Sequence, residues 1–116
     1  MNLPIFSQDK ANHVIYGAII AAIMSSLVSL VIPIIPIFNL ISYSQQHIVS
    51  AIVGLLSAAA GGLIKEMMDK KANDIAIKLE QPVLHSVEKA DFLYTVQGGM
   101  IISIPIILIS LPHIFK

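Results

Sequence analysis

Long apolar runs dominate the chain, and one charged stretch separates them. Residues 11–64 form a run of 54 without Lys, Arg, Asp or Glu, and residues 92–115 form a second run of 24. A water-exposed helix would place polar residues at every third or fourth position of such a run. Neither run has this pattern, so we expect both to lie in a membrane.

Prolines and polar residues divide the runs into helices. The first span is predicted over residues 9–32, because Pro33 cannot continue a helix. Its 24 residues measure about 36 Å, enough to cross a hydrocarbon core of about 30 Å. Further spans are predicted over residues 46–66, capped by Ser44, and 91–111. The chain is therefore predicted to be a single all-α polytopic membrane domain with three transmembrane helices.

The charged stretch between the second and third spans is predicted to be a polar loop, residues 67–90. Within it, residues 72–81 have apolar Ile75 and Leu79 on one side and charged residues on the other. This pattern predicts a short amphipathic surface helix that ends before Pro82.

The lysines predict an orientation. Three crossings put the amino end and the loop on the same side, and that side holds Lys10, Lys65, Lys70, Lys71, Lys78 and Lys89. The other side holds only Lys116. Positively charged loops stay in the cytoplasm, so we expect a cytoplasmic N-terminus and an external C-terminus.

The composition limits the classes of binding partner that we expect. The sequence is 56% hydrophobic and 12% charged, with seven basic residues, all lysine, balanced by seven acids. The lipid bilayer is the expected partner, and a zero net charge gives no reason to expect nucleic acid. Without cysteine there is no disulfide or thiolate metal site.

Small residues recur at helical spacing in all three spans, which allows helices to approach closely. We expect the packing positions to be Gly17, Ala21, Gly54, Ala58, Gly61, Gly62, Gly98 and Gly99. Such faces also favour association with a second copy or with other membrane proteins.

Ionisable residues from separate segments fall on the same membrane side in this topology. They are Asp9, Lys10, His13, Lys65, Glu66, Asp69, His85 and Asp91. Asp9 and His13 share one helix face, and so do Glu66 and Asp69. Because ionisable groups that border hydrocarbon are costly unless they are paired, their convergence is a functional hypothesis.

Three interpretations of this cluster remain open. The residues can be ordinary interfacial groups, with acids near helix N-termini and an i, i+4 pair between Glu66 and Lys70. They can bind a divalent metal such as Zn, Mn or Fe, with ligands drawn from His13, Glu66, Asp69, His85 and Asp91. They can also act on a lipid headgroup by acid–base catalysis, with Glu66 and His13 as the catalytic candidates.

Short motifs in the chain resemble small VanZ-like membrane proteins of bacteria and phages. The motifs are Asp9-Lys10-x-x-His13, Lys65-Glu66-x-x-Asp69, then His85 and Asp91, and Gly98-Gly99. The resemblance implies a cell-envelope role, because the name-giving branch is associated with glycopeptide-antibiotic resistance. It also implies a location in a bacterial inner membrane or a phage-associated membrane. Longer members have an extra span, and residues 1–6 lack the lipobox cysteine of lipoprotein relatives. An anchored lipoprotein would also place the motif side outside, against the lysine rule.

These patterns predict a small membrane protein of the cell envelope or a phage, with a His/Asp/Glu site at one membrane face for a metal or an envelope component. The alternative is a phage membrane protein without a catalytic site, holin-like or structural, that acts by helix self-association.

Overall fold

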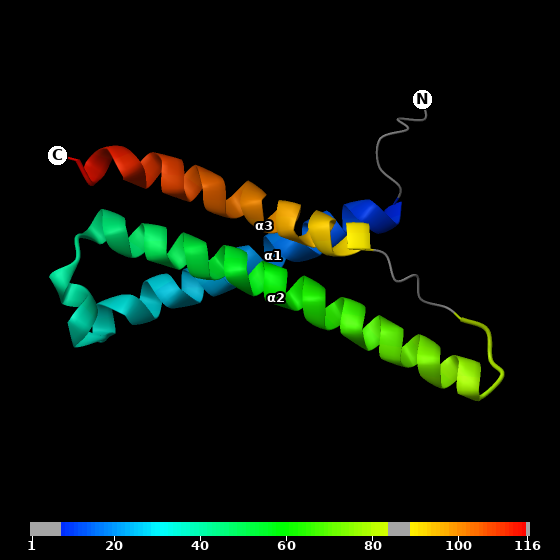
Figure 1. Cartoon of the computed structure of the whole chain (residues 1–116). Coiled ribbons are helices and arrows are strands. Elements are labelled where there is room, and N and C mark those ends of the chain that lie inside the picture. The colour runs from blue at the N-terminus through cyan, green and yellow to red at the C-terminus, as the bar shows by residue number, and fades with distance from the viewer. Residues whose placement is uncertain (1–7, 84–88, 116) are drawn as a thin grey trace, which may run out of the picture.

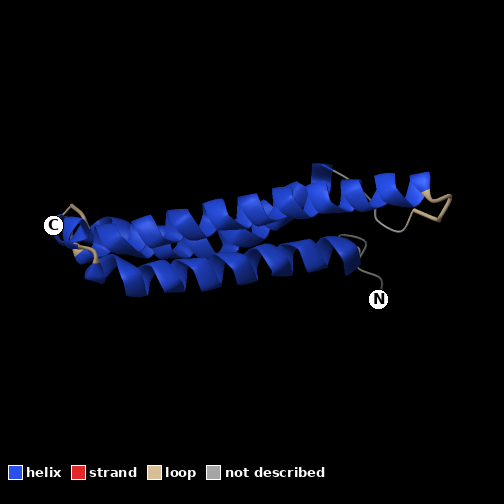
Figure 2. Ribbon diagram, turned by 90° about the horizontal axis from the view of Figure 1, so that it is seen from below, coloured by secondary structure: helices blue, strands red, loops and turns tan. Residues whose placement is uncertain are grey.

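Three long helices run up, down and up through the molecule, each packed against the other two. The structure, a computed structural model, describes residues 8–83 and 89–115. The helices are α1 (Gln8–Val31), α2 (Tyr43–Lys78) and α3 (Lys89–Ser110), with short 3-10 turns at Ile32–Ile34, Pro36–Leu40 and Leu111–His113. Figures 1 and 2 show them as an elongated bundle, and the described residues contain no strand.

The predicted all-α fold with three candidate spans is confirmed. In the described part of the chain, three segments are long and apolar enough to cross a membrane: Gln8–Ile34, Tyr43–Lys78 and Lys89–His113. Large apolar side chains such as Ile15, Leu56 and Leu108 point outward on these helices. This is the arrangement that suits a lipid solvent.

The separate surface helix predicted over residues 72–81 is wrong, and so is the start of the polar loop at residue 67. These residues are helical as far as Lys78, but they continue α2 without a break. No glycine or proline occurs between Gly62 and Pro82, and a Lys65–Asp69 pair spans the expected boundary. At about 54 Å, the 36 residues of α2 exceed a hydrocarbon core of about 30 Å, so α2 extends beyond it.

The cap of α2 lies two residues earlier than predicted. Ser42, not Ser44, accepts a hydrogen bond from the Gln45 backbone N–H at 3.2 Å. The Gln45 side chain accepts one in return from the Ser42 N–H at 2.8 Å. The Ser-x-x-Gln spacing of residues 42–45 is typical of a capping box and predicts the N-cap at Ser42.

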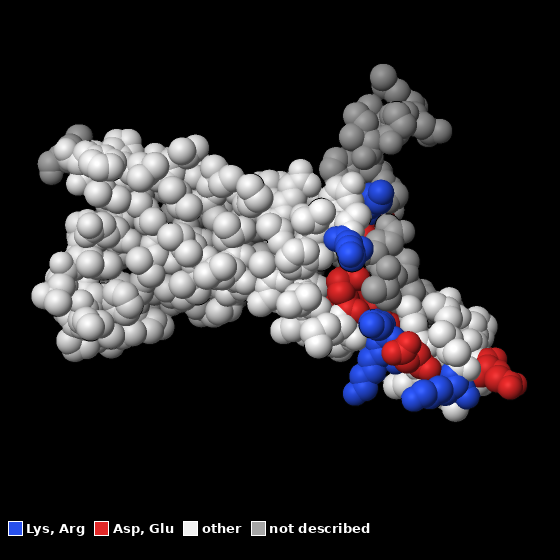
Figure 3. Space-filling view, in the orientation of Figure 1, with Lys and Arg blue, Asp and Glu red and all other residues white. Residues whose placement is uncertain are grey.

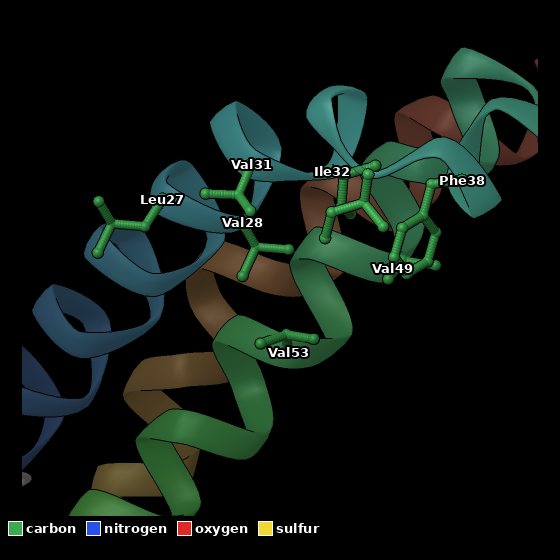
Figure 4. A pocket seen from close by; sticks show the side chains of 8 residues that line it. Leu27, Val28, Val31, Ile32, Phe38, Val49 and Val53 are labelled. Atoms are coloured by element: carbon green, nitrogen blue, oxygen red, sulfur yellow. The ribbon is translucent and has the colours of Figure 1, made fainter.

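Two prolines shape the connection between α1 and α2. Pro33 and Pro36 each open a 3-10 turn, where a missing N–H costs no internal hydrogen bond. The connection closes over an apolar hollow of about 280 Å³. Figure 4 shows its lining, which comes from the end of α1, the turns and the start of α2: Leu27, Val28, Val31, Ile32, Phe38, Val49 and Val53. With no polar side chain in its lining, this hollow offers no chemistry.

The interface between the helices is built from small and hydroxyl-bearing residues. Its buried apolar members are mainly alanines, including Ala21, Ala51 and Ala58. Its buried polar members include Ser25 and Ser103, alongside a cluster at one end described below. Small side chains let the helix backbones approach and maximise van der Waals contact where lipid gives no hydrophobic drive to associate.

Two glycines bring α1 and α3 into direct backbone contact. A Cβ at Gly17 would overlap the backbone of Thr95, and a Cβ at Gly98 would overlap the carbonyl of Val14. At Gly61, by contrast, a Cβ would meet only the tip of the Ile20 side chain, at 2.6 Å. The first two positions therefore require glycine, whereas Gly61 has a neighbour that can move.

We expect Gly98→Ala to destabilise the fold by about 1–3 kcal/mol, because the added methyl must separate two backbones. Gly61→Ala is the matched control, and it should change stability little, because Ile20 can adopt another rotamer. Unfolding of the two variants in mixed detergent, followed by circular dichroism, measures the difference. Equal stabilities would contradict the proposed backbone contact.

The C-terminus of α2 contains a non-glycine residue in the left-handed region. Glu80 has φ 54°, and the Gln81 N–H donates to the Ala76 carbonyl at 2.8 Å in a Schellman arrangement. Glu80→Gly should stabilise this end by about 1 kcal/mol, because glycine adopts this conformation without steric cost. Glu80→Gln controls for the loss of charge. Amide hydrogen exchange of the last turn should slow in Glu80→Gly and stay unchanged in the control.

Candidate functional site

Charged side chains gather at one end of the bundle. Figure 3 shows lysines and acids together where α1 and α3 begin and α2 extends beyond them, while the opposite end is uncharged in this view. The first turns of α1 and α3 therefore lie at the same rim as the charged turns of α2.

Asp9, His13 and Asp91 form the centre of this rim. Each offers a ligand atom, and these atoms all lie within 4.8 Å of one another. His13 Nε2 is 3.6 Å from Asp91 Oδ2 and 3.9 Å from Asp9 Oδ1. The side chains of His13 and Asp91 are 5% and 2% exposed, whereas that of Asp9 is 63% exposed. The centre is therefore closed on the protein side and open to the outside at Asp9.

Thr95 determines how His13 presents its ring. The Thr95 hydroxyl donates to the Asp91 carbonyl at 3.1 Å, and its oxygen lies 3.4 Å from His13 Nδ1. Its single proton is used on the carbonyl, so in this contact Nδ1 is the donor and Thr95 the acceptor. In a neutral imidazole, Nε2 then carries a lone pair that faces both aspartates.

Glu66 approaches this centre from α2. Gly62, one turn earlier on the same face, packs against Thr95, so Glu66 lies at the level of Asp91 in the antiparallel helix pair. It is close enough to Asp91 and His13 to interact with both electrostatically. Both its carboxylate oxygens are buried and have no hydrogen-bond partner among the described residues, as is also true of Asp91 Oδ1. Glu66 therefore borders the group that Asp9, His13 and Asp91 form, without being part of it.

Two lysines of the rim, Lys65 and Lys10, have partners. Lys65 donates to Asp69 Oδ2 at 2.7 Å, so this pair takes the place of the expected Glu66–Lys70 pair. Lys10 lies 5.4 Å from the centre of the Tyr94 ring, within cation–π range. A hollow of about 260 Å³ next to the centre is lined by Asp9, Asn12, His13, Tyr16 and Lys65. The open side of the centre thus faces groups that can donate hydrogen bonds.

The structure brings together three of the predicted residues, Asp9, His13 and Asp91, and places Glu66 close enough to interact electrostatically with two of them. Asp69 is held by Lys65, and His85 lies outside the described residues. Thr95 was missed, although its i, i+4 spacing from Asp91 placed it on the same face of α3. His47 and His113 lie at the other end of the bundle, where His47 stacks edge-on against Tyr43.

The predicted packing residues lie between the helices. Gly54 approaches the backbone of Ala21, and Gly99 lies against Ala58. Gly62 contacts Thr95, and Gly61 faces Ile20. Together with Gly17 and Gly98, these contacts use the small-residue faces within one chain.

No protein-family model matches the chain, and no curated protein or solved structure is similar to it. The VanZ-like resemblance therefore stays a prediction, as do the phage and cell-envelope assignments that depend on it.

Proposed function

We propose that the protein is a membrane protein that binds a divalent transition-metal cation at its charged rim. Asp9, His13 and Asp91 are the proposed ligands. Glu66 lies outside their 4.8 Å spacing, and its side chain would have to move closer to serve as the fourth. Of the three interpretations of the cluster, this one best fits the distances and the burial of its members.

The spacing around His13 Nε2 carries the proposal. Its distances of 3.6 and 3.9 Å to the two aspartates exceed a hydrogen bond, which spans about 2.7–3.2 Å. Ligands about 2.0–2.2 Å from a tetrahedral zinc lie about 3.3–3.6 Å apart, close to these values. A lone pair and two carboxylates that face one another without a proton between them repel, and a cation at their centre removes that repulsion.

The donor set favours a transition metal. Imidazole combined with carboxylates suits Zn²⁺, Mn²⁺ or Fe²⁺, whereas Mg²⁺ and Ca²⁺ prefer oxygen ligands alone. Thr95 acts on the site through His13, because its contact with Nδ1 turns Nε2 toward the aspartates.

The open side at Asp9 supports a site that takes an external ligand. Its hollow offers Asn12, Tyr16 and Lys65 as hydrogen-bond donors, which suits a water or an anionic oxygen such as that of a lipid phosphate. A metal held by protein on one side and open on the other is the arrangement of reactive metal sites, whereas structural sites are closed.

The alternative is a protein that acts by self-association through its small-residue faces. The structure gives this alternative less support than the sequence did. Those faces pack against helices of the same chain, so they are not available to a second copy. We therefore favour the metal site.

Metal binding by the purified full chain in detergent tests the proposal. We expect about one Zn²⁺ or Mn²⁺ per chain by equilibrium dialysis, and weak binding of Mg²⁺. His13→Ala and Asp91→Asn should each weaken binding about a hundredfold, because one of four ligands supplies about 3 kcal/mol. Asp74→Asn, an exposed acid farther along α2, is the control and should bind as the parent does.

Two results would overturn the metal site. One is a folded parent protein that binds no transition metal, which leaves His13 and Asp91 as a structural ion pair. The other is equal affinity in Asp91→Asn and Asp74→Asn. Circular dichroism of each variant separates loss of binding from loss of fold.

Thr95→Val tests the orientation of the imidazole. The substitution keeps the volume but removes the hydroxyl, so metal affinity should fall about 10–100-fold while all four ligands remain. Thr95→Ser restores the hydroxyl and should recover most of the affinity. If Thr95→Val binds metal like the parent, Thr95 has no part in positioning His13.

A further inference from the structure

Gln97 presents an amide on the outer surface of a candidate membrane-spanning helix. It is exposed on α3, six residues and about 9 Å along the helix from Asp91, toward the middle of the span. Its amide has no hydrogen-bond partner among the described residues. A glutamine side chain has two donor hydrogens and an acceptor oxygen, and hydrocarbon satisfies none of them.

The packing of its neighbour determines where Gln97 points. Gly98 contacts the backbone of α1 at Val14, so Gln97 falls at the edge of this contact, on its outer side. There it lines a shallow groove of about 500 Å³ between α1 and α3, together with Ala11, Val14, Ile15 and Ile101. The groove is apolar except for Gln97, and small Ala11 leaves it open.

We propose that this groove is the interface of a homodimer in which Gln97 hydrogen-bonds to Gln97 of a second copy. Copies inserted in the same orientation are related by a two-fold axis along the membrane normal. On such an axis a residue meets its own counterpart at the same depth. An amide is self-complementary, because each can donate to the oxygen of the other.

A second copy fits this groove better than lipid does. Acyl chains fill an apolar groove but leave the amide unsatisfied, whereas a facing amide satisfies it inside hydrocarbon. The small-residue faces that could otherwise hold two copies together are already used within the chain. The outer face at Gln97 therefore carries the association, independently of any metal at the rim.

Cross-linking in lipid vesicles tests the interface, and the absence of native cysteine makes single-cysteine variants simple. Ile101→Cys places a thiol in the groove, at a position 55% exposed. Leu56→Cys is the control, at a lipid-facing position of α2 that is 62% exposed. It lies at a similar depth, since Gly99 contacts the neighbouring Leu55. A short bismaleimide should join Ile101→Cys copies and leave Leu56→Cys copies mostly unjoined.

Gln97→Leu tests the amide itself. In vesicles diluted with lipid and treated with a metal chelator, single-molecule photobleaching should show the dimer constant about tenfold weaker in Gln97→Leu. Gln97→Asn keeps an amide and should retain most of the association. Equal association in Gln97→Leu and the parent, monomers at every protein density, or stronger cross-linking at Leu56→Cys would each overturn the dimer. Metal binding by Gln97→Leu should match the parent, so failure of the rim site and failure of the dimer are separable.

Discussion

The backbone contact between α1 and α3 determines most of what is distinctive in this molecule. At Gly17 and Gly98 the two helices touch without intervening side chains, so within the next two turns the side chains of His13, Asp91 and Thr95 are brought close together. A larger residue at either glycine would push the helices apart, because its Cβ would overlap the facing backbone. The same backbone contact therefore determines both how the helices pack and how the side chains of the site are arranged.

This close packing holds several acidic side chains near one another at the rim. The carboxyl groups of Asp9, Asp91 and Glu66 lie near one another, and Lys65, the lysine beside them, donates its hydrogen bond to Asp69. Negative charge on the buried carboxyl groups of Asp91 and Glu66 is costly unless an opposite charge compensates it. A protonated His13 would cancel one of these charges and a divalent cation would cancel two. The charge balance therefore supports the proposed metal site alongside the distances.

The sequence predicted correctly those features of the fold that a local pattern determines. Charge-free runs located the spans, Pro33 ended α1, and topology placed Asp9, Glu66 and Asp91 at one rim. It misled where a polar stretch without helix breakers was interpreted as a loop, since residues 67–78 simply continue α2. Contacts between distant residues could not be derived. Thr95 beside His13 and the outward position of Gln97 depend on how α3 rotates against α1, and no local pattern specifies that rotation.

The length of α2 also explains why three acids can lie at the same rim. Asp9 and Asp91 occupy the first turns of α1 and α3, where the positive end of the helix dipole favours a carboxylate. Glu66 comes from the antiparallel helix, whose negative end would face it if α2 stopped there. Instead, α2 continues for 12 residues, which moves its terminal carbonyls about 18 Å away. The continuous helix thus removes an unfavourable dipole from the site and holds Glu66 on a rigid element rather than on a loop.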